Sequence, residues 1–192
     1  KYLLYSLIVL MNLEEVYEMD DKTSRFYWEN TPTSEWQEAD FNLVEGINKT
    51  KGLLLEVAGP TTGGYKQIED ASKITKPIYT SNLTPGVTLY DDTETGKIIG
   101  LRGKVDFQAD ARLLPVYDFS VGAIFISHPP FNITNKVIEE MDRVIEPGGY
   151  IIWQGTKPET IYTMLTHGYT LKSYQQYDYS DVSTFNFVCQ KP

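Results

Sequence analysis

The stretch from Leu53 to Tyr65 holds the residues whose types and spacing point most directly to ligand binding. A hydrophobic run, Leu53 to Val57, carries the acidic Glu56 near its end, and a loop rich in Gly, Pro and Thr follows. Small, turn-forming residues after a strand allow close backbone approach to a ligand at the strand's carboxyl end. Two roles stay open for Glu56: contact with that ligand, or hydrogen bonds from the amides of its own loop.

A second polar group, Ser127 and His128, directly follows the apolar run that begins at Ala123. Free histidine has a pKa of about 6.5, which suits a general base acting on a hydroxyl or amine. The alternative is that Pro129 and Pro130 form a rigid turn, with His128 a polar residue at its rim. Both interpretations place these residues at the end of a strand.

The composition limits the possible partners. The chain has 192 residues and a net charge of −9, so it lacks the basic character of a nucleic-acid-binding protein. The longest apolar run, Leu7 to Met11, is far shorter than the roughly 20 residues needed to span a bilayer. The single cysteine, Cys189, cannot form an internal disulfide, and there is no Cys/His cluster with metal-ligand spacing. We therefore expect a cytoplasmic protein with no metal, nucleic-acid or membrane partner.

Hydrophobic periodicity predicts strands and helices in alternation, which is typical of an α/β fold of three layers around a mostly parallel sheet. The expected strands are Leu53–Val57, Pro77–Ser81, Val105–Ala109, Ala123–Ser127, Tyr150–Trp153, Tyr169–Tyr179 and Thr184–Gln190. The expected helices are Tyr65–Ile74, Ile133–Glu146 and Pro158–His167, and an extra hairpin, Val87–Leu101, follows the second strand. The last two strands form an antiparallel hairpin.

We expect one domain over residues 1–192, with a helical cap in residues 1–50 and the α/β core in residues 51–192. The cap contains an amphipathic helix, Tyr2–Met19, and a short helix entered at Ser34. The first helix either packs against the core or covers a ligand.

Two motifs resemble those of class I S-adenosylmethionine-dependent methyltransferases. Residues 137–150 read VIEEMDRVIEPGGY, similar to the family's L-x-E-x-x-R-V-L-K-P-G-G between its fourth and fifth strands. Residues 109–116 read ADARLLPV, similar to G-D-A-x-x-L-P-F. The resemblance implies a Rossmann-like methyltransferase fold of seven strands, S-adenosylmethionine as cofactor, and methyl transfer as activity.

The resemblance also assigns roles to residues. It implies that the first loop and Glu56 face the methionine end, Asn82 the ribose, and Asp110 and Ala111 the adenine. The sequence Ser127-His128-Pro129-Pro130-Phe131 resembles the N-P-P-Y/F motif of amino-methyltransferases, in which the Asn side chain and a Pro carbonyl hold the target amine. His128, the candidate catalytic base, stands in place of that Asn. The implied cofactor-binding residues are Glu56, Ala58, Gly59, Asn82, Leu83, Asp110, Ala111 and Ser127.

Some positions depart from the family pattern. Ala58, Pro60 and Thr62 stand where glycines are expected, Asn82 replaces the ribose-binding acid, and Gly122 replaces an Asp before the fourth strand. Two functions therefore follow as hypotheses. The first is a methyltransferase acting on a small-molecule acceptor that the sequence does not identify. The alternative is a non-catalytic binding module with a degenerate cofactor site.

Overall fold

The structure, a computed structural model, describes residues 41–58, 64–83, 88–92, 97–101, 105–127, 129, 133–179 and 182–192. The predicted helix Tyr2–Met19, the helix entered at Ser34, Gly59 and His128 lie outside the described residues. The helical elements are α3 (Leu43–Lys49), η2 (Gly64–Gln67), η3 (Ala71–Lys73), α4 (Asn135–Val144) and α5 (Pro158–Thr166). The strands are β1 (Leu53–Val57), β2 (Ile78–Asn82), β3 (Thr88–Asp92), β4 (Lys97–Leu101), β5 (Phe107–Gln108), β6 (Val121–Ser127), β7 (Ile145–Thr156), β8 (Thr170–Tyr179) and β9 (Val182–Gln190).

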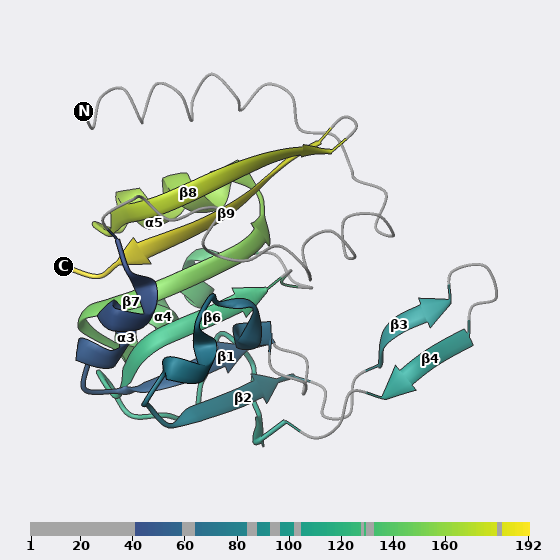
Figure 1. Cartoon of the computed structure of the whole chain (residues 1–192), viewed down its shortest axis with the longest axis horizontal. Helices are drawn as coiled ribbons and strands as arrows, with labels where there is room; N and C mark the ends of the chain where they lie inside the picture. Colours follow the sequence, from purple (N-terminus) through teal and green to yellow (C-terminus); the bar gives the residue numbers. More distant parts are fainter. Residues whose placement is uncertain are drawn as a thin grey trace.

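The main sheet has seven strands in the order β5-β2-β1-β6-β7-β9-β8 (Figure 1). The pairs from β5 to β7 are parallel, and β9 pairs antiparallel with both β7 and β8. The chain moves outward from β1 through β2 to β5 and then returns to the other side of β1 with β6. This confirms the predicted Rossmann-like topology and creates a switch point at β1 and β6, where such sheets bind ligands.

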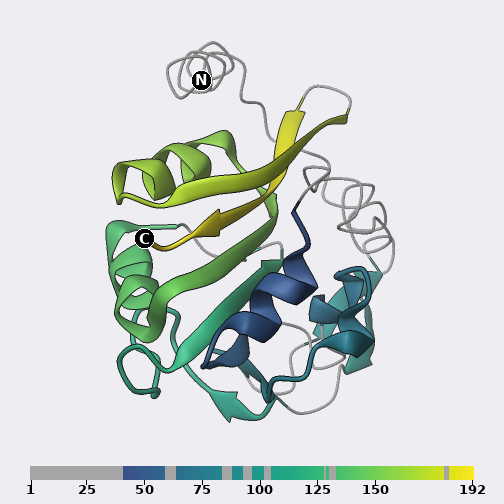
Figure 2. The ribbon, with the colours of Figure 1, turned by 60° about the vertical axis from the view of Figure 1, so that its left-hand side comes forward.

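Helices cover both faces of this sheet, as Figure 2 shows with α3 on one side and α4 and α5 on the other. Leu43 and Ile47 of α3 pack on the face formed by Leu54, Phe125 and neighbouring residues. The opposite face packs against the apolar sides of α4 and α5, whose buried residues include Val137, Ile138, Met141, Ile161 and Met164. Since β6 is buried on both faces, its sequence is a continuous apolar run.

Helix α3 was not among the predicted helices. It has only seven residues, too few for a clear helical period, and its start depends on a cap: the Asn42 side chain accepts a hydrogen bond from the Glu45 amide at 2.9 Å. The fully buried Leu43 and Ile47 make α3 part of the layer on the sheet.

The predicted helix Tyr65–Ile74 is wrong in type. The chain forms two short 3-10 helices, η2 and η3, separated by Asp70 in a left-handed conformation with φ 58°. An α-helix does not continue through such a residue.

Strand β7 begins at Ile145, five residues before the predicted start. Helix α4 ends at Val144, and Pro147 follows within the strand, where the pairing with β6 shifts register between Val121 and Ala123. Proline is tolerated in a sheet at such an irregularity. The predicted hairpin after the second strand is present as β3 and β4, which pair antiparallel in a separate two-stranded sheet (Figure 1).

Among the described residues, none of the helices has the length and apolar character needed to cross a membrane. The same part of the chain contains no group of three or more His, Cys, Asp or Glu side chains placed to hold a metal ion.

The segment before β1 crosses the start of β6 so closely that there is no room for a side chain at Gly52 or Gly122. A Cβ on Gly122 would lie 2.7 Å from the Thr50 Cβ atom and closer still to the Thr50 hydroxyl oxygen. A Cβ on Gly52 would lie 2.5 Å from the Ser120 carbonyl oxygen and 2.6 Å from the Val121 carbonyl carbon. Gly122 therefore stands where the family has Asp because Thr50 fills the space that a side chain would need.

We expect Gly52→Ala to lower the free energy of unfolding by about 3 kcal/mol, because the new methyl group meets rigid backbone atoms. Gly148→Ala is the matched control: its φ is +78°, but a Cβ added there would have no atom within 4 Å. That variant should lose only about 1 kcal/mol, the cost of the left-handed conformation. Urea unfolding of both variants measures the difference, and equal losses would contradict this packing argument.

Candidate functional site

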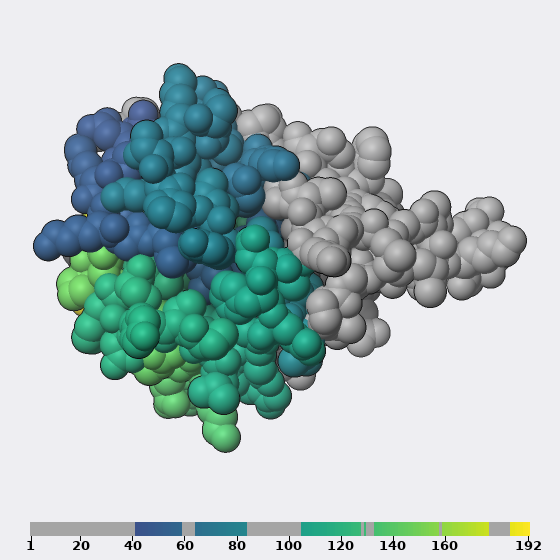
Figure 3. Space-filling view, turned by 90° about the horizontal axis from the view of Figure 1, so that it is seen from below, coloured from purple at the N-terminus to yellow at the C-terminus, as the bar shows by residue number. Residues whose placement is uncertain are grey.

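Three adjacent strands bring Glu56, Asn82 and Asp110 to one edge of the sheet. Strand β1 pairs parallel with β2 through Val57 and Ser81, and β2 pairs parallel with β5 through Asn82 and Gln108. The Ala109 amide donates to the Asn82 carbonyl at 3.0 Å. Asp110, the next residue, therefore lies near the end of β2. Residues 64–83 and residues 105–127 meet on one face of the molecule (Figure 3).

The Glu56 carboxylate is fully buried and is bound by the backbone after its own loop. It accepts hydrogen bonds from the Gly64 amide at 2.7 Å and, more weakly, from the Tyr65 amide at 3.4 Å. A Cβ on Gly64 would lie 2.8 Å from the Glu56 Oε1 atom, so a larger residue there would have to displace the carboxylate. Burial raises the pKa of Glu56 to about 7, although the two amides favour the charged form. Glu56 thus ties the two sides of the loop together.

Ala58, the first residue of that loop, adopts a backbone conformation that usually requires glycine. Ala58, which stands where the family resemblance expects glycine, has φ 56°. This left-handed conformation costs an L-residue about 1 kcal/mol. The chain therefore leaves β1 in the conformation that glycine would favour. Gly59 lies outside the described residues.

Strand β2 ends at the polar Asn82, and the apolar Leu83 follows it. Asn82 is buried, whereas Leu83 is 58% exposed. The Ser81 hydroxyl donates to the Glu56 carbonyl at 3.1 Å, and the Gln108 side-chain amide donates to the Leu83 carbonyl at 2.7 Å. These bonds hold the end of β2 against its neighbours on both sides.

After β5 the chain makes a tight turn, closed by the Leu113 amide donating to the Asp110 carbonyl at 2.9 Å. Ala111 is buried, and Leu113 is 76% exposed. The Asp110 carboxylate accepts hydrogen bonds from Arg112, which lower the pKa of Asp110 to about 2. Leu83, one residue after β2, and Leu113, bonded to the Asp110 carbonyl, are thus two exposed leucines near the same strand ends. Leu113 was not among the predicted site residues.

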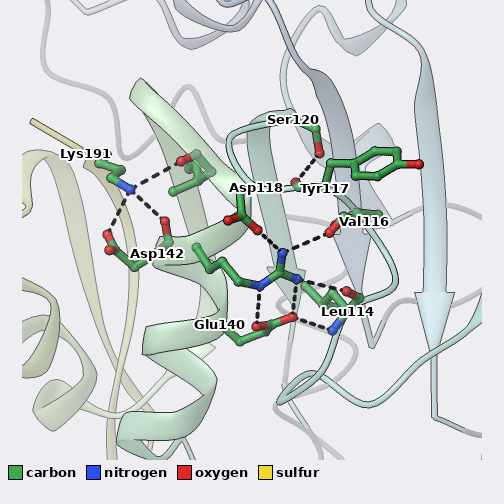
Figure 4. A network of polar contacts seen from close by, with 10 residues as sticks. Leu114, Val116, Tyr117, Asp118, Ser120, Glu140, Asp142 and Lys191 are labelled. Carbon is green, nitrogen blue, oxygen red and sulfur yellow. Dashed lines mark hydrogen bonds and ion pairs between the residues drawn. The ribbon is translucent and has the colours of Figure 1, made fainter.

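The loop that follows is held by Arg143 and Glu140 of α4. Figure 4 shows Glu140 beside the backbone of Leu114. The Leu114 amide donates to Glu140 at 2.6 Å, and Arg143 donates to the carbonyls of Leu114 and Val116 at 3.0 Å each. Arg143 also pairs with Glu140 and Asp118. The hydrogen bond from Arg143 lowers the pKa of Glu140. Two separate motifs of the family resemblance therefore bind each other directly.

Strand β6 ends at Ser127, whose hydroxyl donates to the Gln154 side-chain oxygen of β7 at 2.8 Å. Gln154 is fully buried, and it was not among the predicted site residues. The sequence feature that could have identified Gln154 is its position: it is a single polar amide residue directly after the apolar run of residues 150–153. The bond joins the carboxyl ends of β6 and β7 near the switch point, and His128 lies outside the described residues.

We assign no ligand-binding role to three other residues, Lys66, Trp153 and His167. Trp153 is fully buried in the core. Lys66 is exposed, which is the more common role for a lysine there. His167 is the C-terminal cap residue of α5 and is exposed.

The fold resembles that of solved S-adenosylmethionine-dependent methyltransferases. One, from Methanosarcina mazei, is 12% identical, with a TM-score of 0.52 over 79% of this chain and 98% of the other. Another, a possible histamine N-methyltransferase from Thermotoga maritima, is 14% identical, with a TM-score of 0.50 over 90% and 96%. Phosphoethanolamine N-methyltransferase 2 of Haemonchus contortus, solved with S-adenosyl-L-methionine, is 15% identical, with a TM-score of 0.53 over 75% and 49%.

No family model and no curated protein matches the sequence. At these low identities the likeness concerns the fold, and it confirms the class I methyltransferase fold that the two motifs predicted.

The buried Glu56 predicts a pH dependence of stability. Its pKa of about 7 in the folded protein exceeds the ordinary value of 4.5, so the folded state holds this proton more tightly than the unfolded chain. Between pH 4.5 and 7 the free energy of unfolding should therefore fall with rising pH, by about 3 kcal/mol in total.

Glu56→Gln keeps an acceptor oxygen for the Gly64 amide and removes the titration. Urea unfolding at pH 5 and pH 8 should show this fall in the wild type and in the exposed control Glu139→Gln, and lack it in Glu56→Gln. The same pH dependence in all three proteins would show that Glu56 is not the group responsible.

Proposed function

We propose that this protein is an S-adenosylmethionine-dependent methyltransferase acting on a small-molecule acceptor. One observation carries the proposal: Glu56, Asn82 and Asp110 lie at or just beyond the carboxyl ends of three adjacent parallel strands, in the order that the family resemblance requires. Each lies at the carboxyl edge of the sheet, where ligands bind in folds of this topology. The two motifs that suggested the family are in direct contact, which supports the same assignment.

The residues present fit an adenosine-containing cofactor. Asn82 offers an oxygen that accepts a hydrogen bond from a ribose hydroxyl, without the charge of an acid. Asp110 offers acceptors for the adenine amine, and the Ala111 amide a donor for a ring nitrogen. Leu83 and Leu113 expose apolar surface beside Asp110, suited to the faces of a purine. Glu56 acts through the loop, since it holds the Gly64 amide and so fixes where the loop closes.

The acceptor would lie toward the ends of β6 and β7. S-adenosylmethionine, when bound, supplies an activated methyl group, and the protein's task is mainly to align an acceptor with it. Ser127 and Gln154 are joined at this place by a hydrogen bond, and the next residue in sequence is His128. His128 is the proposed base that takes the proton from a hydroxyl or amine acceptor.

The second candidate is a binding module without catalysis. The structure offers one observation in its favour: both acids of the candidate cofactor site already have protein partners. Glu56 is bound by backbone amides, and Asp110 is bound by Arg112. Asn82, in place of an acid, would further weaken the hold on a ribose.

Calorimetry with S-adenosylmethionine separates the two candidates. We expect saturable binding, and at a ligand concentration of about 100 times the dissociation constant the fold should gain about 2.7 kcal/mol in a thermal or urea unfolding experiment. Leu113→Ser removes apolar contact from the adenine and should weaken binding about tenfold. Tyr162→Ser, an exposed residue on α5, is the control that should leave affinity unchanged.

The absence of heat and of stabilisation at millimolar S-adenosylmethionine would rule out the methyltransferase. Binding without formation of S-adenosylhomocysteine, in incubations with a panel of small hydroxyl and amine compounds, would favour the binding module instead.

A further inference from the structure

The Asp110 carboxylate, the proposed partner of the adenine amine, is occupied by the side chain two residues later. Arg112 donates from Nε to Oδ1 at 2.9 Å and to Oδ2 at 3.1 Å, and its Nη2 atom donates to Oδ2 as well. The Arg112 backbone amide adds a bond to Oδ1 at 2.8 Å. Both oxygens of Asp110 are therefore engaged by one residue.

This arrangement is local and needs little ordering of the chain. Asp110 and Arg112 belong to the same tight turn, which the Leu113 amide closes onto the Asp110 carbonyl. The guanidinium presents its donors in a planar fork that matches a carboxylate, so the contact is bidentate. The hydrogen bonds also lower the pKa of Asp110 to about 2, so the carboxylate stays charged at every physiological pH.

The contact lies at the edge where we place the adenine. Asp110 follows Ala109, whose amide is bonded to the Asn82 carbonyl at the end of β2. The exposed Leu83 comes directly after Asn82, and the exposed Leu113 is bonded through its amide to the Asp110 carbonyl. An adenine amine that approached Asp110 would meet oxygens already bound by Arg112. It would have to displace part of the fork or accept a poorer bond.

We propose that Arg112 is a specificity-determining residue that competes with the adenine amine for Asp110. The inference rests on the proposed function, because it assumes that an adenosine-containing cofactor binds at this edge. It goes further by stating which part of the cofactor the protein recognises poorly. With Arg112 in place, the site selects the ribose, the amino-acid end and the flat apolar ring, and distinguishes adenine weakly from a purine without the amine.

The test compares two ligands that differ at this group. S-adenosylhomocysteine carries the amine, whereas S-inosylhomocysteine has an oxygen there, which accepts hydrogen bonds and does not donate to Asp110. Calorimetry gives both dissociation constants for the wild type, Arg112→Ala, Arg112→Lys and the double variant Arg112→Ala/Asp110→Asn. Since Arg112 is exposed, its replacement should leave the fold intact.

We expect the wild type to prefer the adenosine ligand by about twofold or less. Arg112→Ala should raise that preference to about five- to tenfold, because Asp110 becomes free to accept from the amine. Arg112→Lys, which keeps the charge and loses the fork, should fall between them. The double variant should return to about twofold, which shows that the gain acts through the Asp110 carboxylate.

A second measurement follows Arg112 itself. The NMR signal of its Nε–H group should move when S-adenosylhomocysteine binds to the wild type and move less with S-inosylhomocysteine.

A wild-type preference of tenfold or more, or an unchanged preference in Arg112→Ala, would overturn the role of Arg112 while leaving the proposed function standing. If neither ligand binds to any of the proteins at millimolar concentration, the proposed function is overturned and the inference with it.

Discussion

Two buried or half-buried carboxylates hold strand β1 in place, and the candidate site depends on both. At the start of the strand, Glu146 accepts hydrogen bonds from the amides of Lys51 and Gly52, at 2.6 and 2.9 Å. At its end, Glu56 accepts from the Gly64 amide after the loop. Since β1 lies beside the switch point of the sheet, these bonds fix where the loop begins and ends. Burying the Glu56 carboxylate costs solvation free energy, and the hydrogen bonds from the Gly64 and Tyr65 amides offset part of this cost.

A second set of contacts connects the strand ends to the helix layer. Arg143 and Glu140 of α4 bind the backbone of residues 114–116, so the turn that carries Asp110 is anchored to that helix (Figure 4). A half-buried Arg143 is well suited to this task, because its planar fork bonds two carbonyls and two carboxylates at once. The turn anchored by α4 and the loop tied by Glu56 thus lie at the same edge of the sheet, at the ends of β5 and β1. The arrangement leaves the ends of β6 and β7, with Ser127 and Gln154, for an acceptor.

The fold was predictable from the sequence because the patterns that indicate its strands and helices lie within short segments and recur along the chain. Continuous apolar runs such as residues 121–126 indicate strands buried on both faces. The two motifs indicated the order of the strands through their resemblance to a known family. Helix α3 was missed because seven residues give too few periods, and the 3-10 helices at residues 64–73 because a single left-handed Asp70 interrupts a helical pattern. The position of the site could be predicted from the strand order. The hydrogen bonds within the site could not. That Arg112 binds Asp110, or that Gln154 meets Ser127, depends on side-chain geometry that spacing alone does not determine.

The most direct test of this account is a crystal structure of the protein grown with S-adenosylhomocysteine. The account predicts the adenine between Leu83 and Leu113 beside Asp110, the ribose at Asn82, and the amino-acid end at the loop that Glu56 closes. Ligand density at any other place on the protein, or a site without density at saturating ligand, would contradict it.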